Sequence, residues 1–323
     1  MLFYSSKKPV ELQIIHLNKA QETAKKQLAD AQKEEKSGCT PFAKICQAIK
    51  KSKEDKKSDD KEALHSEKKN VYVLDFDGDI KASAVEHLRE EISTIISSAK
   101  AGDEIVLRLE SGGGQVNAYG LAAAQLMRIK QAGLSLTVCV DKIAASGGYM
   151  MACVADKIIA SDFGVIGSVG VISQLPNFHE LMKKYDIGFE QFTAGEYKRT
   201  VTMFGENTDE DRQKHQEDIN RIHELFKQFV KTHRPNLNIE AIATGEIWLG
   251  ADAMQMGLID EVGTSDSYIL SLLNHHHVYA LHTRSKPTLM EKLGLSDSGL
   301  SVQGVVEHTI QALGQAASKF TRP

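Results

Sequence analysis

Short apolar runs alternate with segments of helical periodicity between residues 71 and 154, and this alternation constrains the fold more than any other feature of the chain. Apolar runs begin at Val71, Ile105 and Leu134. Each is followed by a segment with helical spacing of its apolar residues, over 83–99, 116–130 and 146–154. Strands that alternate with helices form a largely parallel sheet with helices on both faces. The sequence therefore predicts an α/β fold with its ligand site at the carboxyl ends of the strands.

Weaker patterns predict the remaining elements. Apolar residues on one helical face favour helices over about 7–36, 177–185, 208–232 and 302–320, and short apolar runs favour strands over 157–160, 169–173 and 189–193. The helix over 208–232 begins Thr-Asp-Glu-Asp, which is favourable helix-start chemistry, and ends before Pro235.

Charge separates the chain into parts. Residues 1–70 carry 16 Lys or Arg against 11 Asp or Glu, whereas the whole chain has a net charge of −4. We therefore predict a helical stalk over 1–36, a charged flexible linker over 37–70, a folded domain over 71–273 and a C-terminal extension with an amphipathic helix over 274–323. A nucleic-acid-binding tail is not expected, because the charges of the linker are mixed in sign and no aromatic residues lie between them.

One serine has the surroundings of a nucleophile. It lies in Ala144-Ala-Ser146-Gly-Gly, and Lys198 follows 52 positions later in Gly-Glu-Tyr-Lys-Arg-Thr. A serine hydroxyl needs a base to take its proton and backbone N–H groups to bind the oxyanion that forms. The alternatives are a helix N-cap for Ser146 and a solvated surface position for Lys198. The motif is not Gly-x-Ser-x-Gly, since residue 144 is Ala, so it lacks the defining signal of an α/β-hydrolase.

Five stretches in order carry a resemblance to a known family. They are Val-Tyr-Val-Leu-Asp-Phe from Val71, Arg-Leu-Glu-Ser-Gly-Gly-Gly from Arg108, the serine motif from Ala144, Gly-Ser-Val-Gly-Val from Gly167 and Ala-Thr-Gly-Glu from Ala243. With them the chain resembles the signal peptide peptidase A family of serine peptidases, specifically its SohB-type branch. The resemblance implies a Clp protease/crotonase-like fold of repeated strand-strand-helix units, with residues 71–273 as a Ser-Lys peptidase domain.

The resemblance also implies roles for individual residues. Ser146 would be the nucleophile and Lys198 the general base, with the amides of Gly113 and Gly147 as the oxyanion hole. Gly112 stands where the family has a proline, which removes a restriction on that loop. A hydroxyl is needed to aim the lysine amine, and we expect Ser168, or otherwise Thr200, to supply it. A general-base lysine must be uncharged, and apolar residues near Lys198 in sequence could provide the necessary burial.

The expected activity is hydrolysis of peptide bonds in signal-peptide remnants or unfolded peptides at a membrane. Two alternatives stay open: a crotonase-like acyl-CoA enzyme, which would leave Ser146 and Lys198 without a role, and an inactive membrane-associated scaffold. No cofactor is implied. A metal site at His275-His276-His277 is not expected, because no acidic or cysteine partner lies at ligand spacing. Cys139 and Cys153 lie in apolar runs and are expected to be buried.

Membrane association rests on the resemblance alone. The chain has no run of about 18 apolar residues and no signal-peptide pattern. Relatives carry an N-terminal membrane anchor before the charged segment, so an anchor here would be missing or trimmed. The resemblance implies association with the bacterial inner membrane, peptide substrates and a homo-oligomer in the form of a ring or dome.

Overall fold

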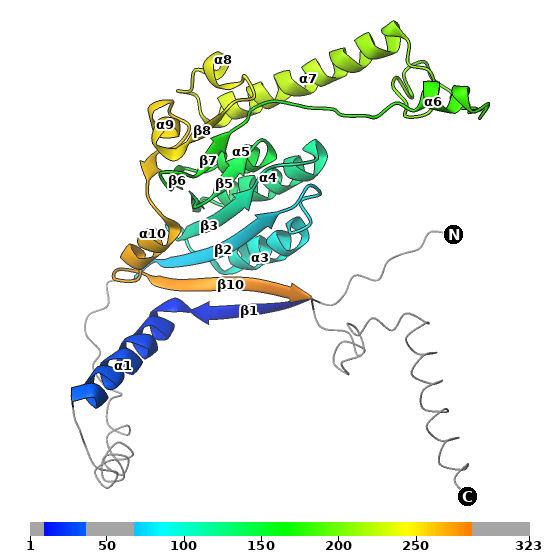
Figure 1. The fold of residues 1–323 in the computed structure, drawn as a ribbon. Coiled ribbons are helices and arrows are strands. Elements are labelled where there is room, and N and C mark those ends of the chain that lie inside the picture. Colours follow the sequence, from blue (N-terminus) through cyan, green and yellow to red (C-terminus); the bar gives the residue numbers. More distant parts are fainter. Residues whose placement is uncertain (1–9, 37–67, 286–323) are drawn as a thin grey trace, which may run out of the picture. The chain divides into compact units, whose positions relative to one another are not determined.

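The structure is a computed structural model and describes residues 10–36 and 68–285 (Figure 1). Its contacts divide the chain into two units, and the larger one, Gln13–His282, contains the sheet and its helices. The predicted linker, apart from residues 68–70, and the predicted helix over 302–320 lie outside the described residues. The predicted domain boundaries therefore stay predictions.

The described strands join into one sheet, with the path β1-β10-β2-β3-β4-β6-β9. Along the path from β10 to β9 neighbouring strands are parallel. A branch leaves the path where β5 pairs with β3 and β7, and β7 pairs with β8 antiparallel. The strands are β1 (Val10–His16), β2 (Asn70–Gly78), β3 (Glu104–Ser111), β4 (Ser135–Val140), β5 (Ile143–Ala145), β6 (Lys157–Ala160), β7 (Val165–Gly167), β8 (Ile247–Leu249), β9 (Glu261–Val262) and β10 (His277–Ser285).

Helices lie between most of these strands and cover both faces of the sheet. On one face α3 and α4 contribute buried residues such as Leu88, Ile92 and Leu126. On the other face α10 packs Ile269 and Leu272 against Val73 of β2 and its neighbours. The helices are α1 (Leu17–Lys36), α3 (Val85–Ser98), α4 (Val116–Gln131), α5 (Gly147–Ala152), α6 (His179–Lys184), α7 (Asp209–His233), α8 (Ile239–Ile242), α9 (Gly250–Gln255) and α10 (Ser265–Leu272).

The predicted α/β fold is confirmed. Parallel strands need crossover connections, and α3 and α4 provide them between β2, β3 and β4. The succession β4, β5, α5 is a strand-strand-helix unit of the predicted kind. Cys139 and Cys153 are buried as expected, and burial raises the pKa of the Cys139 thiol to about 12.

Three local predictions were wrong. Residues 10–16 form strand β1, whereas we predicted that the helix began near residue 7; the helix begins at Leu17. The spacing of the apolar residues in 10–16 fits both a helix and a strand, and pairing in the sheet makes this segment a strand. Residues 169–173 and 189–193 form no strand. Ile172 and Phe192 in these segments are 84% and 90% exposed, and no strand among residues 10–36 and 68–285 pairs with them.

Strand β10 follows the predicted end of the peptidase domain at residue 273. It pairs with β2 in register from His277 opposite Asn70 to Ala280 opposite Val73. Asn18 at the start of α1 is hydrogen-bonded to the residues just before β10: its side-chain amide donates to the carbonyl oxygens of Leu273 (2.9 Å) and His276 (3.0 Å). Residues on both sides of the predicted 71–273 domain thus belong to the same folded unit.

Candidate active site

Ser146 lies in a sharp turn between β5 and α5, at the carboxyl end of a strand as the fold predicted. Its backbone has φ 52° and ψ −118°, a conformation that L-residues rarely adopt and that costs roughly 1–3 kcal/mol. The turn is held because β5 pairs on both sides, and the Ser146 N–H donates to the carbonyl oxygen of Gly167 at 2.8 Å. Strain of this kind is typical of functional positions.

The hydroxyl of Ser146 does not cap helix α5. Ser146 occupies the N-cap position, yet its side chain accepts no hydrogen bond from the first turn of the helix. Among the described residues its oxygen has no hydrogen-bond partner. The N-cap alternative therefore does not account for this serine, and its hydroxyl is available for chemistry.

Gly113 and Gly147 lie directly beside Ser146. A Cβ on Gly113 would come within 2.6 Å of the Gly147 nitrogen and 2.8 Å of the Ser146 Cβ, and the φ of Gly113 is +88°. A Cβ on Gly147 would lie 2.4 Å from Cγ of Tyr119. Both positions thus require glycine, because backbone and ring atoms fill the space that a side chain would need. The structure brings these three predicted residues together.

The backbone N–H groups around Ser146 differ in their partners. Within the described ranges, the amides of Gly147 and Gly114 have no acceptor. The Gly113 N–H donates to Oγ of Ser111 at 3.1 Å. Two amides are therefore free to bind an oxyanion, and the Gly113 amide is held by Ser111. Gly114 was not among the predicted donors; its free amide is visible only in the folded loop.

Ser168 lies next to Ser146 on the neighbouring strand. β5 and β7 are parallel, and Ala145 pairs with Gly167, so Ser146 and Ser168 each follow a paired residue. Ser168 also has a positive φ, of 51°. Its N–H donates to the Glu246 carbonyl oxygen at 2.7 Å, and its hydroxyl donates to the Gly245 carbonyl oxygen at 3.4 Å.

Lys198 lies in a different part of the molecule. Figure 1 shows that the segment between β7 and α7, with α6, extends to the end of α7 that lies far from α5. Lys198 is exposed there and lines a cavity of about 590 Å³ together with Phe189, Phe192, Met203 and Phe204. Its backbone N–H donates to Gly195 O at 3.1 Å. Four of the apolar residues expected near Lys198 line this cavity, but they do not bury the lysine, and within the described chain the lysine does not meet Ser146.

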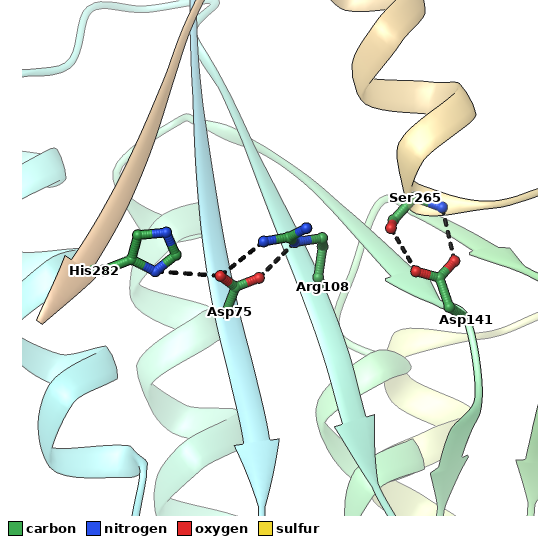
Figure 2. Close-up of polar contacts among 5 residues, drawn as sticks. All are labelled: Asp75, Arg108, Asp141, Ser265 and His282. Atoms are coloured by element: carbon green, nitrogen blue, oxygen red, sulfur yellow. Dashed lines mark hydrogen bonds and ion pairs between the residues drawn. The ribbon is translucent and has the colours of Figure 1, made fainter. Parts of the chain in front are cut away.

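A charged cluster on the sheet lies apart from this site (Figure 2). Arg108 donates from Nε and Nη2 to the two Asp75 carboxylate oxygens, at 2.5 and 2.9 Å, and His282 Nδ1 lies 3.3 Å from the same carboxylate. Asp141 accepts from the backbone and hydroxyl of Ser265 at the start of α10. These contacts join β2, β3, β4, β10 and α10, and we interpret them as structural.

Metal binding and membrane spanning are two further properties that bear on function. In residues 10–36 and 68–285, no group of three or more His, Cys, Asp and Glu side chains could hold a metal ion. In the same ranges no helix is both long and apolar enough to span a bilayer.

Comparison with known proteins identifies the family. The model for peptidase family S49 matches residues 128–278, and the model for the N-terminal part of that family matches residues 3–126. A probable protease SohB from Haemophilus influenzae is 56% identical over 234 residues, which cover 72% of this chain and 66% of that protein. A probable protease SohB from Buchnera aphidicola is 49% identical over 233 residues, 72% of this chain and 69% of that protein.

The chain thus matches about two thirds of the length of these relatives. Among solved structures, a membrane-bound stomatin-specific protease in complex with a substrate peptide aligns with a TM-score of 0.42 and 18% identity, over 71% of this chain and 97% of that one. That likeness is too distant to support an argument about the site. The family models and the relatives agree with each other, and the chain belongs to peptidase family S49.

Proposed function

We propose that this protein is a serine endopeptidase with Ser146 as nucleophile and Lys198 as general base. The observation that carries the proposal is the position of Ser146: a strained turn, a hydroxyl without a partner among the described residues, and the free amide of Gly147 directly after it. These are the requirements for attack on a carbonyl carbon and for binding the resulting oxyanion.

The proposed reaction has two stages. The neutral amine of Lys198 takes the proton of the Ser146 hydroxyl as Oγ bonds to the peptide carbonyl carbon, and the carbonyl electrons move to the oxygen. The C–N bond then breaks, and the lysine passes its proton to the leaving amine. Water hydrolyses the acyl-enzyme with the same lysine as base. Gly147 and Gly113 are the proposed oxyanion donors. Because the Gly113 N–H already donates to Oγ of Ser111, it would be shared between Ser111 and the oxyanion, and the free amide of Gly114 is a second candidate in the glycine loop.

Ser168 is proposed to aim the lysine amine. It is adjacent to Ser146 through the β5–β7 pairing, so an amine that reaches Ser146 also reaches this hydroxyl. The hydroxyl can accept from the amine while it donates to a carbonyl oxygen.

Lys198 is proposed to act on Ser146 of a neighbouring copy. The segment that carries it leaves large apolar side chains in solvent, among them Ile172 (84% exposed), Phe192 (90%) and Tyr185 (63%). Apolar surface of this extent marks an interface. A second copy would cover it and would also bury Lys198, as a neutral amine requires. The proposed assembly is a homo-oligomer, in the ring or dome form that the family resemblance implies.

The proposed substrates are hydrophobic or unfolded peptides, including signal-peptide remnants, at a membrane. Membership of a peptidase family supports peptides as substrates, and the three phenylalanines in the cavity beside Lys198 support hydrophobic ones. Membrane association is proposed from the family resemblance.

Labelling with a fluorophosphonate probe tests the nucleophile. The wild type should be labelled, Ser146→Ala should not, and Ser97→Ala on the exposed face of α3 should be labelled like the wild type. Labelling that survives in Ser146→Ala would reject the proposal. A folded wild type that is neither labelled nor active would support an inactive scaffold.

Co-expression of two inactive variants tests the shared site. Ser146→Ala retains the lysine and Lys198→Ala retains the serine, so a mixed oligomer regains complete sites. Random assembly of equal amounts should restore about one quarter of wild-type activity, because each site needs one copy of each kind in the correct order. An active wild type with no recovery in the mixture would mean that both groups come from one chain.

Lys198→Arg distinguishes a base from a positive charge. The guanidinium stays charged and cannot accept the serine proton. We therefore expect Lys198→Arg to be as inactive as Lys198→Ala in peptide hydrolysis. An active arginine variant would assign the base to another group.

A further inference from the structure

A buried chain of hydrogen bonds lies beneath the glycine loop. The Tyr119 hydroxyl donates to the carbonyl oxygen of Asp79 at 2.8 Å and lies 2.5 Å from Oγ of Ser111. Ser111 Oγ accepts from the Gly113 N–H at 3.1 Å and lies 3.3 Å from the Gly78 carbonyl oxygen. The chain thus connects helix α4, the end of β3, the loop after β2 and the glycine loop.

The same two residues, Tyr119 through its ring and Ser111 through its backbone, also lie against the other side of the candidate oxyanion hole. The ring of Tyr119 is fully buried and occupies the space where a Gly147 side chain would be, 2.4 Å from the would-be Cβ. A Cβ on Gly148 would lie 2.4 Å from the Ser111 carbonyl oxygen. Tyr119 and Ser111 therefore fix the glycine loop against the turn that carries Ser146.

The directions of these hydrogen bonds follow from the available protons. Burial raises the pKa of Tyr119, so its hydroxyl stays protonated and donates to Asp79. Ser111 then donates its single proton to the Tyr119 oxygen, because two oxygens 2.5 Å apart need a proton between them, while its own oxygen accepts from the Gly113 N–H. Each hydroxyl has a donor and an acceptor role, so removal of one leaves a buried group unsatisfied.

We propose that Ser111 and Tyr119 are positioning residues that hold the backbone amides of the glycine loop and of Gly147 in the geometry that binds the oxyanion. This inference rests on the proposed Ser146 chemistry. Neither residue touches the substrate in this assignment. Both residues should therefore stabilise the transition state, in which negative charge develops on the carbonyl oxygen. Binding of the uncharged peptide should not depend on them.

Tyr119→Phe keeps the ring against Gly147 and removes only the hydroxyl. We expect kcat for peptide hydrolysis to fall about tenfold or more, with KM almost unchanged, since loss of a whole oxyanion donor costs about 10²–10³. Ser111→Ala should have the same signature. A peptide aldehyde, whose carbonyl carbon bonds to Ser146 Oγ as its oxygen gains the charge or proton, should lose affinity in proportion to kcat/KM.

Tyr149→Phe is the matched control. Its hydroxyl is equally buried and donates to a carbonyl oxygen, that of Leu258 at 3.0 Å, but has no hydrogen bond to the glycine loop. It should reduce thermal stability about as much as Tyr119→Phe and leave kcat near the wild-type value. The assignment is overturned if Tyr119→Phe keeps wild-type kcat, if both tyrosine variants lose kcat equally, or if aldehyde affinity is unchanged.

A different result would reject the proposed Ser146 chemistry itself: an active Ser146→Ala protein or an inactive wild type. If Ser111→Ala does not fold, which unfolding curves would reveal, Tyr119→Phe alone decides the outcome.

Discussion

At the scale of the residue, two of the four non-glycine residues with positive φ among the described residues lie in the proposed site. Ser146 and Ser168 both have positive φ, at the ends of neighbouring strands. Serine gains nothing locally from this conformation, so the surrounding sheet must impose it. Gly113 is the third member of this group, with a φ of +88° and backbone atoms on the side where a Cβ would lie.

Gly113→Ala should abolish peptide hydrolysis, because its methyl group would push the loop away from Gly147 and Ser146. Gly133→Ala is the matched control: Gly133 also has a positive φ, of +74°, but no atom lies within 4 Å of its would-be Cβ. It should lose roughly 1–2 kcal/mol of stability through backbone strain and keep its activity. Initial rates and urea unfolding of both variants test this. Equal activity of the two would show that crowding at Gly113 is unimportant.

At the scale of the element, α7 is fastened at both ends by polar groups. Thr208 and Asp211 form a reciprocal capping box at its start. At its end the Arg234 guanidinium donates to both Asp260 carboxylate oxygens, at 2.9 and 2.8 Å, and the Ile158 N–H donates to the same carboxylate at 2.8 Å. The Arg234–Asp260 pair thus ties the end of α7 to strand β6 and sets the direction in which α7 leaves the sheet.

Asp260→Asn should destabilise the protein in a pH-dependent way. Burial alone would raise the pKa of the Asp260 carboxyl, but the hydrogen bonds from Arg234 and Ile158 outweigh it and hold the pKa below its usual value. Its stabilisation is therefore present at neutral pH and is lost as the pH falls below about 4. We expect a loss of about 1–2 kcal/mol at pH 7, discounted for partial exposure, and a smaller difference at pH 3.

Asp218→Asn provides the control, since Asp218 forms an exposed ion pair with Lys214 on the same helix. Its cost should be about 0.5 kcal/mol or less. Urea unfolding at the two pH values measures both variants, and a gap for Asp260→Asn that widens toward pH 3 would contradict the assigned sign.

At the scale of the whole molecule, the segment between β7 and α7 is the proposed interface between copies of the chain. This segment carries the expected catalytic lysine, and several of its large apolar side chains are exposed to solvent. Ile172→Asp and Phe192→Asp should therefore reduce the oligomer and its activity together, with little change in the thermal stability of the separated chain. Light scattering, hydrolysis rates and thermal unfolding test this.

Leu270→Asp on α10 is a comparable exposed apolar site, 54% exposed, outside that segment. It should leave both assembly and activity intact. If Phe192→Asp assembles like the wild type, the segment is not the interface.

The sequence by itself determined the α/β class, the helices from α1 to α7 and the strands β2, β3, β4 and β6 of the sheet. It also indicated the serine turn and the glycine loop. These features depend on neighbours along the chain: the period of the apolar residues, the glycines beside Ser146 and the capping residues of α7.

The tertiary structure decided everything that depends on distant partners. It made residues 10–16 a strand, since either period fits them and sheet pairing chose one. It left 169–173 and 189–193 without strands, since no strand in the described part of the chain pairs with them. It also separated Lys198 from Ser146, because spacing in sequence does not define the path of the intervening segment, and it joined Tyr119, Ser111 and Gly113 through hydrogen bonds that no periodicity indicates.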